Sequence, residues 1–160
     1  MIFARVRDEE AAEVLQLYRT LAGTEYCMWD EDYPTEREIA FDMSREALFC
    51  MKEKNRIIGV ISIDDDPEVQ MLDCWSAELT PAAELSRLGV APQWQNQGIA
   101  GELLLNAMKE LKEQGYQAVR LLVAKENAKA LRAYRKLEFH TAGECTRFGL
   151  EYWCYEKALL

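Results

Sequence analysis

The sequence has one histidine, His140, and five cysteines that never form a CxxC pair. An odd number of widely spaced cysteines argues against a disulfide framework and against a thiolate zinc site. One histidine cannot build a histidine-rich metal cluster, and a Ser-His-Asp or Cys-His scheme would have to use that residue alone. We therefore expect no bound metal, and we expect most of the thiols to be buried and free.

Long apolar runs are also missing. The longest, the interrupted run over residues 57–63, is far shorter than the roughly 20 residues needed to span a bilayer. The N-terminus MIFARVRDEE reaches charged residues within five positions, which leaves no room for the apolar core of a signal peptide. We expect no membrane segment and a cytoplasmic location.

Basic residues are scarce relative to acidic ones. The 19 Lys and Arg against 28 Asp and Glu give a net charge of −9. Such a charge repels phosphate backbones and anionic lipid, so we expect no nucleic-acid or membrane partner, and a cationic ligand is favoured. No repeat or Pro/Gly/Ser-rich linker divides the chain, and 160 residues suit one domain. We expect a single domain over residues 1–160.

Hydrophobic periodicity predicts the elements of the N-terminal part. Residues 2–7 alternate like a strand, and Asp8 then caps a predicted helix. One face of that helix would hold Ala11, Val14, Leu15, Tyr18, Leu21 and Ala22. A second helix follows Pro34, with a capping box formed by Thr35 and Glu38. Its charged residues, which predict an exposed helix, are Glu36, Arg37, Asp42 and Glu46.

The later part alternates strands with helices. A hairpin is predicted over residues 47–63 with its turn at Lys54 and Asn55, and the acidic residues 64–66 before Pro67 predict another turn. Strands are predicted at 85–90, 118–124, 140–145 and 150–158, and helices at 99–114, before Gly115, and at 127–137. This order mixes hairpins with crossovers. It predicts an α+β (mixed α/β) fold with one central, mainly antiparallel mixed sheet flanked by helices.

The clearest local feature is the segment LSRLGVAPQWQNQGIAGELL, residues 85–104. A predicted strand runs through Pro92 into the loop QNQGIA and directly into the strongest predicted helix. Backbone amides at a helix N-terminus lack intrahelical partners, and the helix dipole adds partial positive charge, so this geometry favours a pyrophosphate. Gly98 and Ala100 would keep side chains away from it. The sequence contains neither the GK[ST] tail of a P-loop nor a GxGxxG motif of a dinucleotide fold.

The motif Gln95-x-x-Gly98-x-Ala100 resembles the acetyl-CoA-binding motif of the GNAT N-acetyltransferase superfamily. A second element, Asn127-x-x-Ala130-x-x-x-Tyr134-x-x-x-Glu138-Phe139, resembles the segment that follows the next strand in that family. Together the two motifs cover residues 85–139 and imply a GNAT-like fold with acetyl-CoA as acyl donor and no metal.

The resemblance also implies roles for individual residues. Asn127 would hydrogen-bond the pantetheine arm, and Tyr134 would protonate the leaving thiolate. A second interpretation of Tyr134 is a core aromatic residue at helical spacing. The residues that would bind the cofactor, by backbone pairing with pantetheine or by amides around the pyrophosphate, are Leu88, Gly89, Val90, Gln95, Asn96, Gln97, Gly98, Ile99 and Ala100.

A general base is needed as well, because an alkylammonium is not a nucleophile until it loses a proton. Glu84 is the first candidate, since its spacing from Gly98 is that of the catalytic glutamate in one branch of the family. The other interpretations are an exposed acid at a strand start, a base role for Glu78 or Glu25, or a water chain. Glu138 stands where the family usually has glycine, and a left-handed backbone there would cost on the order of 1 kcal/mol.

The resulting hypothesis is direct transfer of acetyl from acetyl-CoA to a primary amine, without a covalent enzyme intermediate. The alternative is a catalytically silent acyl-CoA-binding sensor or interaction module. We interpret residues 26–33, YCMWDEDY, as a substrate-side loop and not as a protein-binding patch. The acids that favour a cationic acceptor are Glu25, Asp30, Glu31, Asp32, Glu78 and Glu84. The acceptor itself stays open, and a homodimer is one of the oligomeric states that the resemblance allows.

Overall fold

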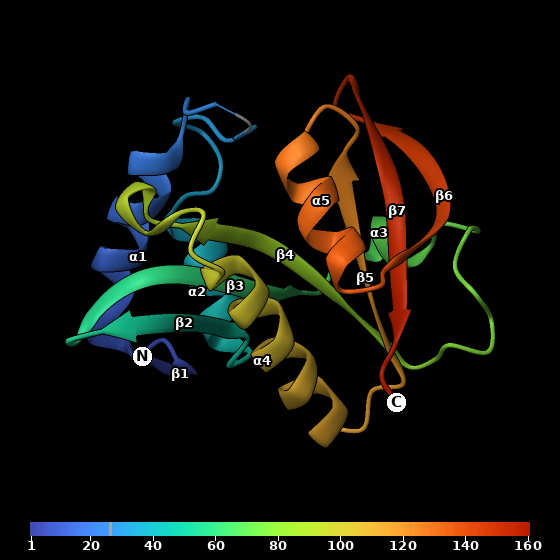
Figure 1. Ribbon diagram of the computed structural model, residues 1–160, viewed down its shortest axis with the longest axis horizontal. Helices are drawn as coiled ribbons and strands as arrows, with labels where there is room; N and C mark the ends of the chain where they lie inside the picture. The colour runs from blue at the N-terminus through green and yellow to red at the C-terminus, as the bar shows by residue number, and fades with distance from the viewer. Residues whose placement is uncertain (26) are drawn as a thin grey trace. The chain divides into compact units, whose positions relative to one another are not determined.

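The computed structural model describes residues 1–25 and 27–160, so Tyr26, the first residue of the predicted substrate-side loop, lies outside the described residues. Two compact units are formed, residues 1–63 with 87–107 and residues 64–86 with 108–160. Within the described chain, seven strands form one sheet in the order β1-β2-β3-β4-β5-β7-β6 (Figure 1). The β1–β2, β2–β3, β5–β7 and β6–β7 pairs are antiparallel, and the β4–β5 pair is parallel. The predicted mixed, mainly antiparallel sheet is confirmed.

The elements agree closely with the predicted order. The strands are β1 (Ile2–Arg5), β2 (Leu48–Glu53), β3 (Arg56–Asp64), β4 (Ala82–Val90), β5 (Ala118–Ala124), β6 (His140–Arg147) and β7 (Leu150–Ala158). The helices are η1 (Asp8–Glu10), α1 (Ala11–Leu21), α2 (Glu36–Ser44), α3 (Pro67–Gln70), η2 (Pro92–Trp94), α4 (Ile99–Glu113) and α5 (Ala128–Lys136). The chain described here contains no helix long and apolar enough to cross a membrane.

The first unit is built on the β1–β2–β3 meander. Leu48, Cys50 and Val60 belong to a buried cluster with residues of α1 and α2. Because neighbouring residues in a strand point to opposite faces, Gly59 lies on the other face, where an added Cβ would meet Leu103 of α4 at 2.8 Å. The helices α1 and α2 therefore cover one face of the meander, and the start of α4 covers the other.

The second unit is built on β5, β7 and β6. β7 pairs antiparallel with both of its neighbours, and β4 joins in parallel over residues 82–84. In β5 all residues except Leu122 are buried, as the continuous run AVRLLVA predicts for a strand covered on both faces. Figure 1 shows α5 lying along β5 and β7.

Local signals set most element boundaries. The hairpin turn falls at Lys54 and Asn55, both at positive φ, and Gly115 ends α4 at φ +99°. The capping box of α2 forms as predicted, with the Thr35 amide donating to Glu38 at 2.9 Å. These elements follow from short-range chemistry alone.

Three predictions were wrong in detail. Asp8 does not cap α1, because it lies inside η1, and Glu10 occupies the N-cap position without a side-chain bond. Asp42 is not on an exposed helix face, since it is 0% exposed. The acidic residues 64–66 lead into the short helix α3, which Asp66 caps by accepting from the Glu68 amide at 3.0 Å.

Candidate active site

The loop between η2 and α4 is the predicted anion site of the first unit. Asn96 and Gly98 both have left-handed backbones, with φ of 62° and 83°. The first turn of α4 closes where the Glu102 amide donates to the Gly98 carbonyl at 3.1 Å. The amides of residues 98–101 precede that bond and lie at the positive end of the helix dipole. The loop can therefore offer several consecutive donors to a pyrophosphate.

Space at Gly98 is open, because a Cβ added there would have no atom within 4 Å. Glycine is thus favoured at this position by the left-handed backbone and not by crowding within the chain. The neighbouring Gln95 side chain helps to shape the loop, since its Nε2 donates to the Val90 carbonyl at 3.0 Å.

The start of α4 packs closely against β3 within the first unit. Ile99 and Leu103 are 2% and 0% exposed. A Cβ at Gly59 would lie 2.8 Å from Leu103 Cδ1 and 3.4 Å from Ile99 Cγ2, so the glycine in β3 is what lets the helix approach this closely. The donors at the helix N-terminus are held in place by this packing.

Residues 88–90, the predicted pantetheine strand, are the last residues of β4. Gly89 is closely covered, because a Cβ there would lie 2.7 Å from Leu21 and 3.0 Å from the Trp29 ring. Just beyond the strand, the Ala91 amide donates to the Ile58 carbonyl at 2.8 Å. This end of β4 is fixed to β3.

Tyr134 lies in the second unit, on α5. It is 8% exposed, and its ring packs edge-on against Phe139 and Tyr155 at centroid distances of 5.6 and 6.2 Å. Burial raises the pKa of Tyr134 to about 12. The hydroxyl is therefore protonated at neutral pH, as a proton donor must be. The ring packing also fits the second interpretation, a core aromatic.

Asn127 is the N-cap of the same helix. Its Oδ1 accepts from the Ala130 amide at 3.1 Å. The cap uses the carbonyl oxygen of the side chain, so its NH₂ group is the part that could donate to a ligand.

Glu84 is buried, at 7% exposure, which excludes the interpretation as an exposed acid at a strand start. Glu84 is the last residue of β4 that pairs with β5, and its partner across the strands is Arg120. On the other side of β5, Arg120 pairs with Glu156 of β7. The Arg120 guanidinium lies 4.8 Å from the centroid of the Trp75 ring. Burial lowers the pKa of Arg120, and the charges of Glu156 and Glu84 oppose that change. Glu78 and Glu25, the alternative bases, are exposed.

Glu84 and Tyr134 lie on opposite faces of the sheet. Residues paired across strands share a face, so Glu84, Arg120 and Glu156 point the same way. Tyr155, which packs against Tyr134, neighbours Glu156 in β7 and points to the other face. A general acid and a general base must both reach the same reacting carbon, directly or through water, and the sheet lies between these two side chains, so the fold does not bring Glu84 and Tyr134 together.

Comparison with known sequences identifies the family. The sequence model described as the acetyltransferase (GNAT) family matches residues 12–139. This chain belongs to the GNAT acetyltransferase family. The match includes every candidate cofactor-binding residue in both units.

Curated relatives support the same family over a shorter stretch. A mycothiol acetyltransferase from Corynebacterium aurimucosum is 37% identical over 71 residues, which make up 44% of this chain and 23% of that protein. A mycothiol acetyltransferase from Thermobifida fusca is 37% identical over 59 residues, or 37% and 18% of the two chains. The chain thus matches less than a quarter of the length of either relative.

Solved structures described as acetyltransferases share the fold. An N-acetyltransferase from Staphylococcus aureus Mu50 superposes with a TM-score of 0.78 at 20% identity, covering 99% of this chain and 98% of that one. The yncA protein of Salmonella typhimurium, solved with its cofactor acetyl-CoA, superposes with a TM-score of 0.77 at 18% identity, covering 99% and 94%. At such identities these similarities establish the fold.

One departure from the GNAT motif has a clear structural outcome. Glu138, in the place of the usual glycine, has φ +63°, so the left-handed backbone is kept without the glycine. The Phe139 amide still donates to the Tyr134 carbonyl at 3.2 Å and closes the helix. The substitution therefore affects this turn and leaves α5 intact.

Sequence reasoning missed two buried arginines. Arg120 interrupts the apolar run of β5, and Arg87 stands alone in the segment LSRLGV; both are at most 8% exposed. A charged residue inside a strand predicted to be buried is the signal that could have revealed them.

Among the described residues, no group of three or more His, Cys, Asp or Glu side chains is arranged to hold a metal ion.

Proposed function

We propose that this protein is an acetyl-CoA-dependent N-acetyltransferase that transfers acetyl to a primary amine by direct attack. The observation that carries the proposal is the loop before α4, where left-handed Asn96 and Gly98 lead into the free amides of a firmly seated helix, in a chain of the GNAT family. Residues 95–100 would hold the pyrophosphate, residues 88–90 would pair with pantetheine, and Asn127 would bind the pantetheine arm.

Two side chains of the second unit are the candidates for proton transfer. Glu84 would take a proton from the incoming ammonium, and Tyr134 would give one to the departing thiolate of CoA. The carbonyl carbon then gains the amine nitrogen and loses sulfur, and the nitrogen gives up its second proton, which restores the Tyr134 hydroxyl. No bond to the protein is formed. Because the sheet lies between Glu84 and Tyr134, a water chain stays the alternative route for the proton of the ammonium.

Binding is tested first. Acetyl-CoA should raise the melting temperature, because a ligand of the folded state stabilises it by about 2.7 kcal/mol at one hundred times its dissociation constant. Gly98→Glu should abolish the shift by placing negative charge in the pyrophosphate site. The matched control is Gly115→Glu at the other end of α4, which also has positive φ and open space and should keep the shift. If acetyl-CoA gives no shift with the wild type, the proposed function is wrong.

Turnover is tested by thiol release from acetyl-CoA across a panel of amines. Release with at least one amine supports the enzyme. Binding without release from any amine favours the alternative, an acyl-CoA-binding sensor or interaction module. Glu84→Gln decides the base: an unchanged kcat/KM for the best amine would assign the proton to a water chain.

A further inference from the structure

The strand assigned to pantetheine contains a strained residue that the proposed function does not use. Arg87 has φ +46° inside β4 and is 8% exposed. A left-handed backbone is unfavourable for a residue with a Cβ, and it persists only where surrounding contacts fix it. Arg87 must therefore be held in place by its neighbours.

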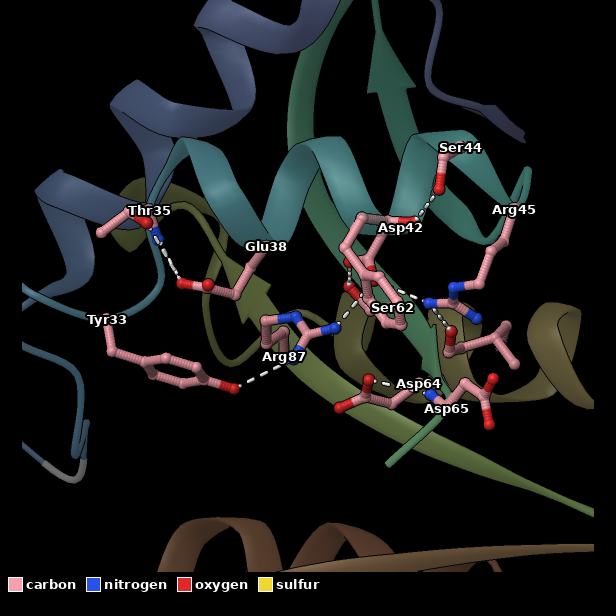
Figure 2. Close-up of polar contacts among 12 residues, drawn as sticks. Tyr33, Thr35, Glu38, Asp42, Ser44, Arg45, Ser62, Asp64, Asp65 and Arg87 are labelled. Carbon is pink, nitrogen blue, oxygen red and sulfur yellow. Dashed lines mark hydrogen bonds and ion pairs between the residues drawn. The ribbon is translucent and has the colours of Figure 1, made fainter. Parts of the chain in front are cut away.

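The side chain of Arg87 provides that hold (Figure 2). Its Nη2 donates to Asp42 Oδ1 at 2.8 Å, and its Nη1 donates to the Tyr33 hydroxyl at 3.0 Å. The Asp42 side chain is 0% exposed and that of Arg87 is 4% exposed. Charge-assisted bonds are strong in such a setting, and removal of one partner leaves a buried charge uncompensated.

Asp42 is itself fixed independently of Arg87. Its Oδ2 accepts from Ser62 Oγ at 2.6 Å, and its Oδ1 accepts from Arg45 Nη2 at 2.9 Å. Arg45 Nη2 also donates to the Ile63 carbonyl at 2.9 Å. The carboxylate is thus tied to α2 and to β3, and it offers β4 a rigid point of attachment.

The other end of the pantetheine strand is fixed as well. The Ala91 amide donates to Ile58, and the Val90 carbonyl accepts from Gln95. Residues 88–90 lie between these bonds and Arg87. With both ends anchored, the direction of their backbone amides and carbonyls depends on the left-handed turn at Arg87.

We propose that Asp42 and Arg87 are positioning residues for the acetyl donor: their ion pair holds the left-handed backbone at Arg87, so that residues 88–90 present their amides and carbonyls to the pantetheine arm. The pair acts through the strand that follows and not on the reacting atoms. This inference rests on the proposed function, because it assumes that acetyl-CoA binds along residues 88–90.

The test compares Asp42→Asn with Arg45→Gln. Asp42→Asn keeps the size of the side chain but removes the charge that holds Arg87, and it should raise the acetyl-CoA dissociation constant at least tenfold. Arg45→Gln removes the other guanidinium from the same carboxylate, so we expect both variants to have a lower melting temperature than the wild type. Arg45→Gln should nevertheless change the acetyl-CoA dissociation constant less than twofold. Binding is measured by calorimetry at a temperature where each variant is folded.

Steady-state kinetics separate positioning from general destabilisation. We expect the KM for acetyl-CoA to rise in Asp42→Asn while the KM for the amine stays the same, whereas loss of folded protein alone lowers only the apparent kcat. If Asp42→Asn does not fold, the same measurements on Arg87→Lys test the inference. Lysine keeps the charge and most of the volume, but it cannot make the bonds to both Asp42 and Tyr33. Wild-type donor affinity in the folded variant would overturn the inference, whereas failure of the wild type to bind acetyl-CoA would overturn the proposed function instead.

Discussion

Individual residues of the candidate site differ in how far the sequence could reveal them. Gly98 and Glu138 were identified from motif positions, and the structure gives both the positive φ that those positions require. Arg87 and Asp42 were not paired in advance, because their contact joins residues 45 positions apart and depends on how α2 packs. Motif chemistry is local in sequence, whereas a buried ion pair is a product of tertiary packing.

The Tyr134 hydroxyl separates binding from chemistry. Tyr134→Phe keeps the ring between Phe139 and Tyr155, so acetyl-CoA affinity should stay within a few-fold. Loss of a placed proton donor should lower kcat by about 10²-fold. The matched control is Tyr155→Phe, which removes a hydroxyl from the adjacent buried ring and should leave kcat unchanged. Equal turnover in both variants would support the interpretation of Tyr134 as a core aromatic residue without a catalytic role.

Glu138 carries a backbone cost that glycine would not. Since its φ is +63°, Glu138→Gly should raise the free energy of unfolding by up to about 1 kcal/mol. Glu138→Ala removes the charge but keeps the strain, so it should give no comparable gain. Urea unfolding of the three proteins measures the difference, and a less stable glycine variant would contradict the strain argument.

At the scale of elements, hydrophobic periodicity and capping chemistry predicted nearly every helix and strand. The failures have a common physical cause. Asp8 and Asp42 both look like solvent-exposed acids in sequence, but the packing of η1 and α2 decides their environment. The order of strands in the sheet, with β7 between β5 and β6, was likewise beyond a one-dimensional pattern.

The attachment of η1 to β2 should make the protein sensitive to acid. Glu10 is 6% exposed and lies 2.5 Å from the Lys52 ammonium. Burial alone would raise the pKa of Glu10, but Lys52 and Arg7 outweigh it and lower that pKa to about 2. A carboxyl with a depressed pKa in the folded state stabilises fully above its unfolded pKa, and that stability is lost as pH falls towards the folded value.

We therefore expect the wild type to lose up to roughly 3 kcal/mol of unfolding free energy through Glu10 as pH falls from about 4.5 to about 2. Urea unfolding across this range measures the loss. Glu10→Gln should be less stable at neutral pH and should lack this part of the acid dependence. Glu9→Gln, at an exposed neighbour, should retain it. An identical pH dependence in Glu10→Gln and wild type would exclude the ion pair as its source.

For the whole molecule, the charge distribution bears on the acceptor. The net charge is −9, and four exposed acids, Glu25, Asp30, Glu31 and Asp32, lie close together in sequence before α2. Glu84 does not belong to these exposed acids, because it is buried and pairs with Arg120 of β5 across the strands. A surface rich in one sign of charge attracts ligands of the other sign and raises association rates 10-fold or more.

We propose on this basis that the acceptor is a small amine or polyamine, or an amine in a basic context, in preference to amino acids that carry a free carboxylate. In an amine panel, kcat/KM should be highest for multiply charged amines and should fall as salt rises, because exposed charges are screened beyond about 10 Å at 0.1 M. The double variant Glu31→Gln/Asp32→Asn should lose much of this preference. Glu113→Gln/Glu126→Gln, an equal loss of exposed charge elsewhere in the sequence, should keep it. A preference for anionic acceptors, or rates that do not change with salt, would refute the charge argument and leave the acetyltransferase proposal untouched.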